Sequence, residues 1–362
     1  MIRPYAALGL GLLAGVAMAA DPLANLAKLA PPAVGAYFGA YLEFGELEEQ
    51  VTLERIDAFT DLVGKQPAII AFANPWGRGR FPAEQVRVIH RSGAVPLILW
   101  YPQGLTATQI PNPYDLKEII AGRWDAYVDA WAAAAKATGK PILVSWALEM
   151  NGDWYPWSGA FHGAEEPLDQ AEPARAKGPE TYKAAYRHLV DRTRAAGADN
   201  LTWVFHANNH SWPQEPWNQM ANYYPGSEYV DWLGMSAYGK QFPDQEWASV
   251  ASVIGEGYGE LMAVDPGKPI LIGEWGVGEF PHSGNKADWL RQALEQMRNL
   301  PRLKGAVYWQ ERWQNQDLSY SNLRVNSSLG ALTAFRDGIR DGFWLERPAE
   351  SNGGSAPAAA RR

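Results

Sequence analysis

A carboxylate stands at the end of an apolar run and is followed closely by an amide and three aromatic rings. Glu149 ends the run, and Asn151, Trp154, Tyr155 and Trp157 follow it. Burial raises the pKa of a carboxyl because the charged form is disfavoured, and a group that must hold a proton near neutral pH needs such a shift. Flat aromatic faces suit a ligand with apolar C–H faces and polar edges, such as a sugar ring. We therefore expect Asn151, Trp154 and Trp157 to contact a ligand; the alternative is that both Trp residues are core and Glu149 is a solvated loop residue.

A second glutamate ends another apolar run. Glu274 lies between Gly273 and Trp275, and the small neighbours are interpreted as room for a bulky substrate with Trp275 lining the floor. Judged alone, Glu274 fits a salt bridge at a strand end as well as it fits catalysis, but its pairing with Glu149 favours catalysis. Two carboxyls in one mouth can hydrolyse a glycoside: one protonates the leaving oxygen, and the other attacks the anomeric carbon or activates water.

Other polar and aromatic residues follow further apolar runs. Tyr238 lies where its hydroxyl could reach Glu274, and Trp309 is expected to stack under a sugar, although packing is the alternative. His206, Asn208 and His210 cluster after another run. No carboxylate completes a recognisable metal set with the two His residues, so we expect His206 and Asn208 to contact sugar hydroxyls instead.

Eight short apolar runs are the predicted strands that position these groups. Their near-continuous hydrophobicity is typical of parallel strands covered by helices on both faces. The runs are 34–40, 68–73, 95–101, 142–148, 201–206, 232–236, 270–273 and 305–310. We therefore predict an α/β fold, a single (β/α)₈ TIM barrel, with the catalytic groups at the carboxyl ends of its strands.

Apolar residues recur at helical spacing in three stretches between the runs, at 124–135, 182–190 and 290–297. Gly139 and Gly197 stand where the first two helices should stop, as a left-handed cap requires. The sequence Gly-Lys-Pro-Ile-Leu occurs at 139–143 and again at 267–271, and each copy leads to one of the two glutamates. The aromatic residues within these helices are interpreted as core and are assigned no function.

The two ends of the chain predict its organisation. Residues 1–20 carry a basic residue, an apolar run and an Ala-x-Ala match, which together predict a signal peptide and hence a secreted or periplasmic protein. The alternative is an N-terminal anchor that is retained. Residues 21–346 are predicted to form one (β/α)₈ glycoside hydrolase domain, and residues 347–362 a disordered tail. We expect no membrane contact beyond the signal peptide.

Composition excludes several function classes. A net charge of −8 without a basic stripe argues against nucleic acid, and the absence of cysteine excludes disulfides, thiolate metal sites and a thiol nucleophile. The sequence also lacks the phosphate-loop, zinc-protease and serine-esterase motifs. We therefore expect no cofactor and no metal, and a polysaccharide or oligosaccharide as the partner. A monomer is the expected state, although the sequence itself does not determine the oligomeric state. The 17 Trp and 16 Tyr residues fit ring-faced ligands.

Together these residues resemble glycoside hydrolase family 26, a family of retaining β-mannanases with a (β/α)₈ fold. The resemblance covers roughly residues 34–339, and its most specific motif is Glu-Met-Asn-Gly-Asp-Trp-Tyr-Pro-Trp at 149–157. Supporting motifs lie at 122–125, 224–226, 230–232, 269–274 and 323–327. The resemblance implies that Glu149 is the general acid/base, Glu274 the nucleophile and Tyr238 the residue that orients it, with Trp309 lining the subsite of the attacked sugar.

Two positions depart from the family pattern. Leu148 stands where the family usually has His, and Ser145 stands where it has Arg. The family's His contributes polar contacts beside the reacting sugar, which Leu cannot replace because it has no donor or acceptor. Either His206 or Asn208 supplies the missing contact, or a different sugar occupies that subsite.

The expected activity is that of a retaining endo-β-glycanase that hydrolyses internal β-glycosidic bonds of a polysaccharide, first of all of the β-1,4-mannan type. Retention requires carboxyl groups about 5–5.5 Å apart. The alternatives are a β-1,3/1,4-glucanase, a hydrolase of a bacterial exopolysaccharide and a non-catalytic glycan-binding relative, although a binder has no reason to keep two costly carboxylates. The loops 155–179, 207–228 and 311–328 are expected to wall the groove, with Trp212 and Trp217 as stacking platforms.

Overall fold

The computed structural model describes residues 23, 28–45, 48–105, 112–172 and 174–348. The predicted signal peptide and all but the first two residues of the predicted tail lie outside the described residues. Within them, no helix is both long enough and apolar enough to cross a bilayer.

Eight parallel strands close into a barrel. Neighbouring strands follow chain order, and β8 pairs with β1 to complete the circle. The strands are β1 (Ala36–Tyr41), β2 (Ile69–Pro75), β3 (Val95–Tyr101), β4 (Ile142–Trp146), β5 (Leu201–Asn208), β6 (Trp232–Tyr238), β7 (Ile270–Gly276) and β8 (Leu303–Trp309). The prediction of a (β/α)₈ barrel is confirmed, and each predicted run overlaps its strand.

The end of β4 differs from the prediction. The strand stops at Trp146, two residues before the predicted end at Leu148. The reason is a change of backbone conformation, because Ala147 and Glu149 have positive φ angles of 47° and 56°. Such angles are uncommon outside glycine, and they turn the chain sharply at the barrel mouth.

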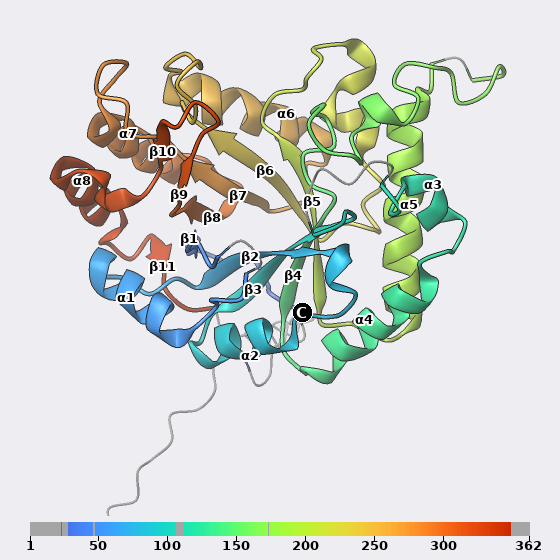
Figure 1. The fold of residues 1–362 in the computed structure, drawn as a ribbon, viewed down its shortest axis with the longest axis horizontal. Coiled ribbons are helices and arrows are strands. Elements are labelled where there is room, and N and C mark those ends of the chain that lie inside the picture. Colours follow the sequence, from blue (N-terminus) through green and yellow to red (C-terminus); the bar gives the residue numbers. More distant parts are fainter. Residues whose placement is uncertain (1–22, 24–27, 46–47, 106–111, 173, 349–362) are drawn as a thin grey trace, which may run out of the picture.

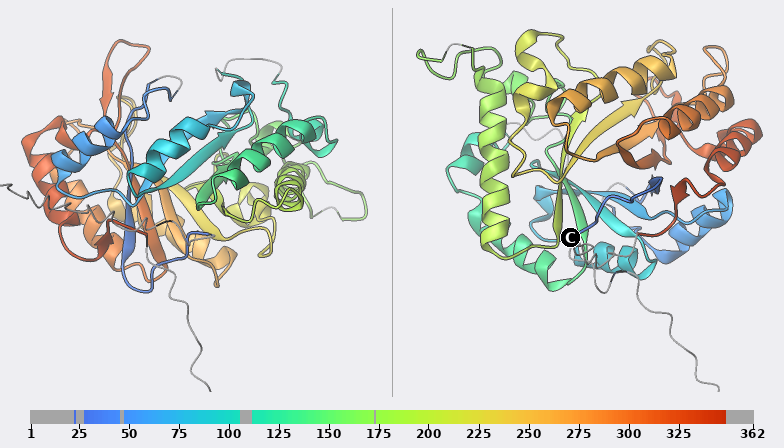
Figure 2. Two further views of the ribbon diagram at one scale, coloured as in Figure 1. Left: turned by 90° about the horizontal axis from the view of Figure 1, so that it is seen from below. Right: turned by 180° about the vertical axis from the view of Figure 1, so that it is seen from behind.

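Helices cover the outside of the barrel, as Figures 1 and 2 show. They are α1 (Leu53–Val63), α2 (Ala83–Arg91), α3 (Leu116–Ile120), α4 (Asp125–Ala137), α5 (Lys177–Ala195), α6 (Gly257–Val264), α7 (Lys286–Arg298) and α8 (Leu329–Ile339). The predicted helical stretches correspond to α4, α5 and α7. Gly139 and Gly197 follow α4 and α5 with φ angles of 63° and 74°, as the prediction of left-handed caps requires.

The alternation of strands and α-helices is interrupted once. Between β5 and β6 the chain forms only two 3₁₀ turns, Pro216–Asn218 and Met220–Tyr223, and a π-helix at Ala251–Glu256 leads into α6. Two additions follow β8: a hairpin of β9 (Arg312–Gln314) and β10 (Tyr320–Asn322), and the short strand β11 (Trp344–Leu345), which pairs with β1.

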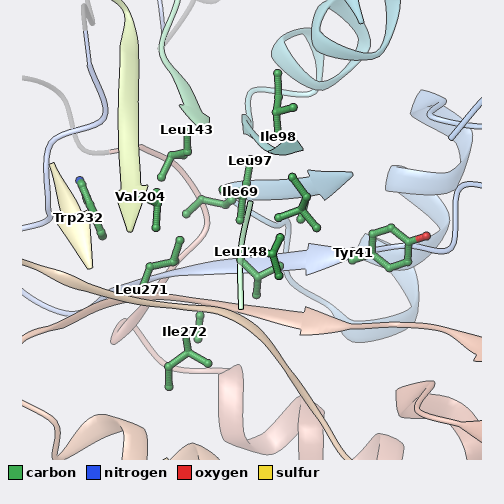
Figure 3. Packing of buried hydrophobic residues seen from close by; sticks show 14 of the residues in the cluster. Tyr41, Ile69, Leu97, Ile98, Leu143, Leu148, Val204, Trp232, Leu271 and Ile272 are labelled. Atoms are coloured by element: carbon green, nitrogen blue, oxygen red, sulfur yellow. The ribbon is translucent and has the colours of Figure 1, made fainter. Parts of the chain in front are cut away.

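Aliphatic side chains fill the interior of the barrel beneath the carboxyl ends of its strands. Figure 3 shows Ile69, Leu97, Leu143, Val204 and Leu271 packed together, and all five are fully buried. Because successive strand residues point to opposite faces, their neighbours pack outward against the helices. Because the barrel interior is filled, a ligand of the barrel is expected at its mouth.

Candidate active site

A cavity of about 930 Å³ opens at the carboxyl ends of β4 to β8. Four carboxyl side chains line it: those of Glu149, Glu274 and Glu311, and that of the exposed Glu246. The aromatic residues that line it are Trp154, Tyr155, Tyr238, Phe242, Trp309 and Trp313. Carboxyl groups for chemistry and rings for apolar sugar faces therefore share one cavity.

Glu149 is placed by the turn that follows β4. Its backbone N–H donates to the carbonyl of His206 on β5 at 2.8 Å, which fixes the turn to the neighbouring strand. Its side chain is 7 % exposed and accepts hydrogen bonds from Trp154 Nε1 at 2.7 Å and from the hydroxyl of Ser236. Burial raises the pKa of Glu149 above its ordinary value, and the two donors oppose this shift. The alternative of a solvated loop residue is excluded.

Glu274 lies within β7 and is 6 % exposed. The hydroxyl of Tyr238, at the end of β6, donates to Glu274 Oε2 at 2.8 Å. The other oxygen, Oε1, is buried and has no hydrogen-bond partner among the described residues. Burial raises the pKa of Glu274, and the charge of Glu149 raises it further. The predicted contact between Tyr238 and Glu274 is present, whereas a salt bridge is not what holds this glutamate.

Mutual repulsion makes the two carboxyls titrate as a pair. Two buried carboxylates that face one cavity cannot both ionise easily, so the first ionises at lower pH than the second. Over the interval between these steps the pair holds a single proton. One group is then an acid and the other an anion, as an acid and a nucleophile must be at the same time.

Trp309 ends β8 and forms part of the cavity wall. Its ring stacks on Tyr41 of β1 with centroids 3.8 Å apart and an interplanar angle of 9°. Its Nε1 donates to Glu311 Oε2 at 2.6 Å. Tyr41 in turn donates to the buried Glu48 at 3.2 Å. The indole of Trp309 is therefore held on one face by Tyr41 and at its Nε1 edge by Glu311.

A chain of polar groups runs through the barrel interior toward Glu149. Ser145 Oγ lies 2.9 Å from His206 Nδ1, and His206 Nε2 lies 3.0 Å from Ser236 Oγ, whose hydroxyl reaches Glu149. Burial lowers the pKa of His206 to about 3, so the imidazole is neutral and carries one N–H. If Ser236 donates to Glu149 it must accept from His206 Nε2–H, and Ser145 then donates to Nδ1.

The predicted contact between His206 and a sugar is wrong. His206 is fully buried and does not line the cavity. The interpretation of Gly273 changes with it, because a Cβ there would come within 2.5 Å of His206 Cε1. Gly273 leaves room for the imidazole rather than for a substrate.

Three further predicted ligand contacts are also wrong. Asn151 is fully buried and joins two loops, accepting from the backbone of Asn208 at 2.8 Å and donating to its carbonyl at 3.0 Å. Trp157 is 1 % exposed and stacks behind Tyr155 at 4.4 Å. Trp275 points outward from β7 and packs on Tyr308 and on Phe335 of α8. These residues support the site without facing the cavity.

The remaining predicted residues do face the cavity. Trp154, Asn208, Tyr238 and Trp309 all line it. Each of the three predicted wall loops contributes at least one lining residue, but the loop after β6 contributes more, including Lys240, Phe242 and Gln245. Sequence reasoning missed this loop and Glu311. A carboxylate between Trp309 and Trp313 was the signal that could have found the latter.

Trp212 and Trp217, the predicted platforms, lie apart from the main cavity. Trp212 is 57 % exposed and borders a smaller hollow of about 410 Å³. Trp154 and Asn208 line both this hollow and the main cavity. Trp217 is partly buried and packs against the core. Among the described residues, no group of three His, Asp or Glu side chains is placed to hold a metal ion.

Residues 100–294 match the family model for glycosyl hydrolase family 26. The chain belongs to glycosyl hydrolase family 26. It is 30 % identical over 310 residues to Endoglucanase H of Acetivibrio thermocellus, and the match covers 82 % of this chain and 31 % of that protein. It is 22 % identical over 260 residues to Beta-1,3-xylanase TXYA of a Vibrio species, covering 70 % of this chain and 50 % of that protein. It therefore spans from 31 % to 50 % of the length of these relatives.

Solved family 26 structures share the fold. The mannanase man26 of Bacillus subtilis has a TM-score of 0.59 at 20 % identity, covering 90 % of each chain. The endo-β-1,4-mannanase catalytic domain of Bacillus sp. JAMB-750 has a TM-score of 0.61 at 20 % identity, covering 88 % of this chain and 89 % of that one. The closed barrel of parallel strands is thus the family's architecture.

Proposed function

We propose that this family 26 protein is a retaining endo-β-glycanase that hydrolyses internal β-glycosidic bonds of a polysaccharide of the β-1,4-mannan type. The observation that carries the proposal is the pair of buried carboxyls, Glu149 and Glu274, facing one aromatic-lined cavity with raised pKa values. A protein that only binds glycans gains nothing from two such groups, because each is costly to bury. Family membership and the mannanase relatives support the same reaction.

In the proposed reaction Glu149 is the general acid/base and Glu274 the nucleophile. As the glycosidic C–O bond breaks, Glu149 gives its proton to the leaving oxygen and Glu274 bonds to the anomeric carbon. Glu149 then takes a proton from water, which attacks the anomeric carbon and releases Glu274. Glu274 Oε1 is the oxygen free to attack, because Tyr238 occupies Oε2.

Endo action fits a groove that continues on both sides of the carboxyl pair. Beyond Glu149 the hollow bordered by Trp154 and Trp212 extends the cavity. The main cavity is lined as well by Trp309, Trp313 and Phe242, and the rings of Trp313 and Phe242 meet edge to face at 5.7 Å. Because the acid lies on the leaving-group side, the Trp212 hollow should receive the sugars that depart first.

A β-1,3/1,4-glucan is the second candidate substrate, because of the residues beside the acid. Leu148 is fully buried, and both ring nitrogens of His206 are hydrogen-bonded to serines. Neither residue therefore supplies the polar contact that the family's His makes. Asn208 lines the cavity and is the polar residue that remains available for this contact. The similarity to Endoglucanase H points in the same direction.

Export completes the proposal. The signal-peptide pattern in residues 1–20 supports a secreted or periplasmic protein that meets its polysaccharide outside the cytoplasm. Amino-terminal sequencing of the protein recovered from periplasm and medium tests this, and an uncleaved cytoplasmic chain would contradict it.

The activity is tested by reducing-end release from mannan, mixed-linkage glucan and xylan. Glu149→Gln and Glu274→Gln should each abolish turnover with unchanged folding, while the exposed surface variant Glu295→Gln should match the wild type. Proton NMR of the first product should show the β-anomer, as retention demands. Full activity in Glu274→Gln, or an initial α-anomer, would overturn the mechanism.

A further inference from the structure

We propose that Glu311 is a sugar-binding and positioning residue: one carboxylate oxygen fixes the indole of Trp309, and the other accepts a hydroxyl of the sugar that lies on that ring. This inference rests on the proposed function and names a further residue of the same site. Glu311 lies two residues beyond the end of β8, and its side chain lines the cavity.

The hydrogen bonding of Glu311 leaves one oxygen available. Trp309 Nε1 donates to Oε2 at 2.6 Å. Within the part of the chain that the structure describes, no other side chain donates to this carboxylate. A charged carboxylate in a cavity wall can accept several hydrogen bonds, and the hydroxyls at the edge of a sugar ring are suitable donors.

The indole of Trp309 is oriented for one ligand face. Tyr41 covers one face at 3.8 Å, and Tyr238 meets the ring at an interplanar angle of 87° with centroids 6.4 Å apart. The uncovered part of the ring lines the cavity. With Tyr41 beneath and Glu311 at the Nε1 edge, the ring can neither tilt nor flip without losing a contact.

Holding an indole does not by itself require a charge. A glutamine would accept from Trp309 Nε1 equally well and would avoid the cost of a half-buried anion. Burial raises the pKa of Glu311, which shows that its surroundings compensate the charge poorly. Arg324 opposes the shift only weakly, because its guanidinium is bound to Glu43 at 2.6 Å. A hydroxyl-rich ligand supplies the missing donors.

The position of Glu311 also affects the nucleophile. Its charge is one of the causes that raise the pKa of Glu274 and of Tyr238. The charged and titratable groups around it are Glu43, Glu48, Tyr41, Tyr238, Glu274 and Arg324. Lys240 lines the same cavity, but its ammonium donates to the carbonyls of Pro243 and Gln245. The subsite is therefore acidic and selects neutral sugars over uronic acids.

The experiment compares Glu311→Gln and Glu311→Leu with the wild type and with the surface variant Glu295→Gln. The Gln variant keeps the acceptor for Trp309 and loses the charge. We expect KM to rise about tenfold, as for a lost hydrogen bond to a charged group, and the acidic limb of kcat/KM to move to lower pH. The limb moves because Glu274 must be ionised to attack and its anionic neighbour is gone. Glu311→Leu should lose more, since it also frees the indole.

Binding separates this inference from the proposed reaction. Calorimetric titration with mannohexaose and a mixed-linkage β-glucan hexasaccharide is done in the Glu149→Gln background, with and without Glu311→Gln. An inactive wild type with Glu311-dependent binding would refute the reaction and support the inference. Equal affinity with and without Glu311→Gln, no binding in either case, or an unmoved acidic limb in an active enzyme would overturn the inference. If Glu311→Leu fails to fold, the Gln variant alone decides.

Discussion

Removing the hydroxyl of Ser236 should raise the upper pH limit of catalysis. Ser236 is fully buried, and its hydroxyl is one of two donors to Glu149, the other being Trp154 Nε1. Both donors stabilise the charged form of Glu149 and lower its pKa. In Ser236→Ala the pKa of Glu149 rises, so Glu149, the proposed general acid, keeps its proton to higher pH. The basic limb of kcat/KM should move upward.

The magnitude follows from the hydrogen bond that is lost. A hydrogen bond to a charged group contributes about 1.5–3 kcal/mol, and about 1.4 kcal/mol corresponds to one pH unit. Trp154 remains and the neutral acid keeps part of the interaction, so the basic limb should move by about one unit. Folding should lose about 1–3 kcal/mol, because His206 Nε2–H is left without its acceptor.

Ser145→Ala is the matched control. It deletes the same hydroxyl from the other end of the same chain and leaves His206 Nδ1 without its donor, but Ser145 is not a partner of Glu149. The two variants should lose similar stability in urea unfolding, and only Ser236→Ala should shift the basic limb. A limb that stays in place in Ser236→Ala, or that moves equally in both variants, would refute the reasoning.

Three further expectations concern other parts of the site. Tyr238→Phe removes the hydroxyl that donates to Glu274 at 2.8 Å, so kcat should fall about 10- to 100-fold. The acidic limb of the pH profile of kcat/KM should move to higher pH, and an unchanged limb in stopped assays from pH 4 to 9 would contradict this. Burial raises the pKa of Glu48 to about 8, so its contribution to stability is complete below pH 4.5 and is lost as pH rises through 8. Glu48→Gln should lack this loss, which amounts to at most about 5 kcal/mol, and identical urea midpoints against pH in both proteins would exclude a protonated Glu48. Trp212→Ala should raise KM about tenfold for hexasaccharides and leave KM for trisaccharides unchanged, as measured by chromatography of the products. Equal effects on both substrate lengths would show that Trp212 does not contact the substrate.

The sequence predicted the parts of the structure that depend on short-range patterns. Continuous apolar runs located all eight barrel strands, and helical spacing located α4, α5 and α7. Both glutamates were recognisable because a carboxylate at the end of such a run must lie at the barrel mouth. The contact between Tyr238 and Glu274 followed from adjacent strands of known order.

Side-chain direction was harder to predict. Trp275 follows Glu274 directly, and because successive strand residues face opposite sides, it had to point away from the cavity. Asn151 and Trp157 lie in the irregular segment that follows the positive-φ residues Ala147 and Glu149, where no periodicity tells inside from outside. His206 was misplaced because its partners, Ser145 and Ser236, come from two other strands. Contacts among three strands leave no signal in any one segment.

The position of His206 couples residues on neighbouring strands. Ser145 on β4 and Gly273 on β7 both leave space that the imidazole of β5 fills, and a single added carbon at Gly273 already approaches it within 2.5 Å. An arginine introduced at position 145 would meet the same ring. An arginine at this position therefore requires a change at His206 as well, and either change alone should lower the stability of the barrel. Reconstructed ancestors should change these positions together rather than one at a time.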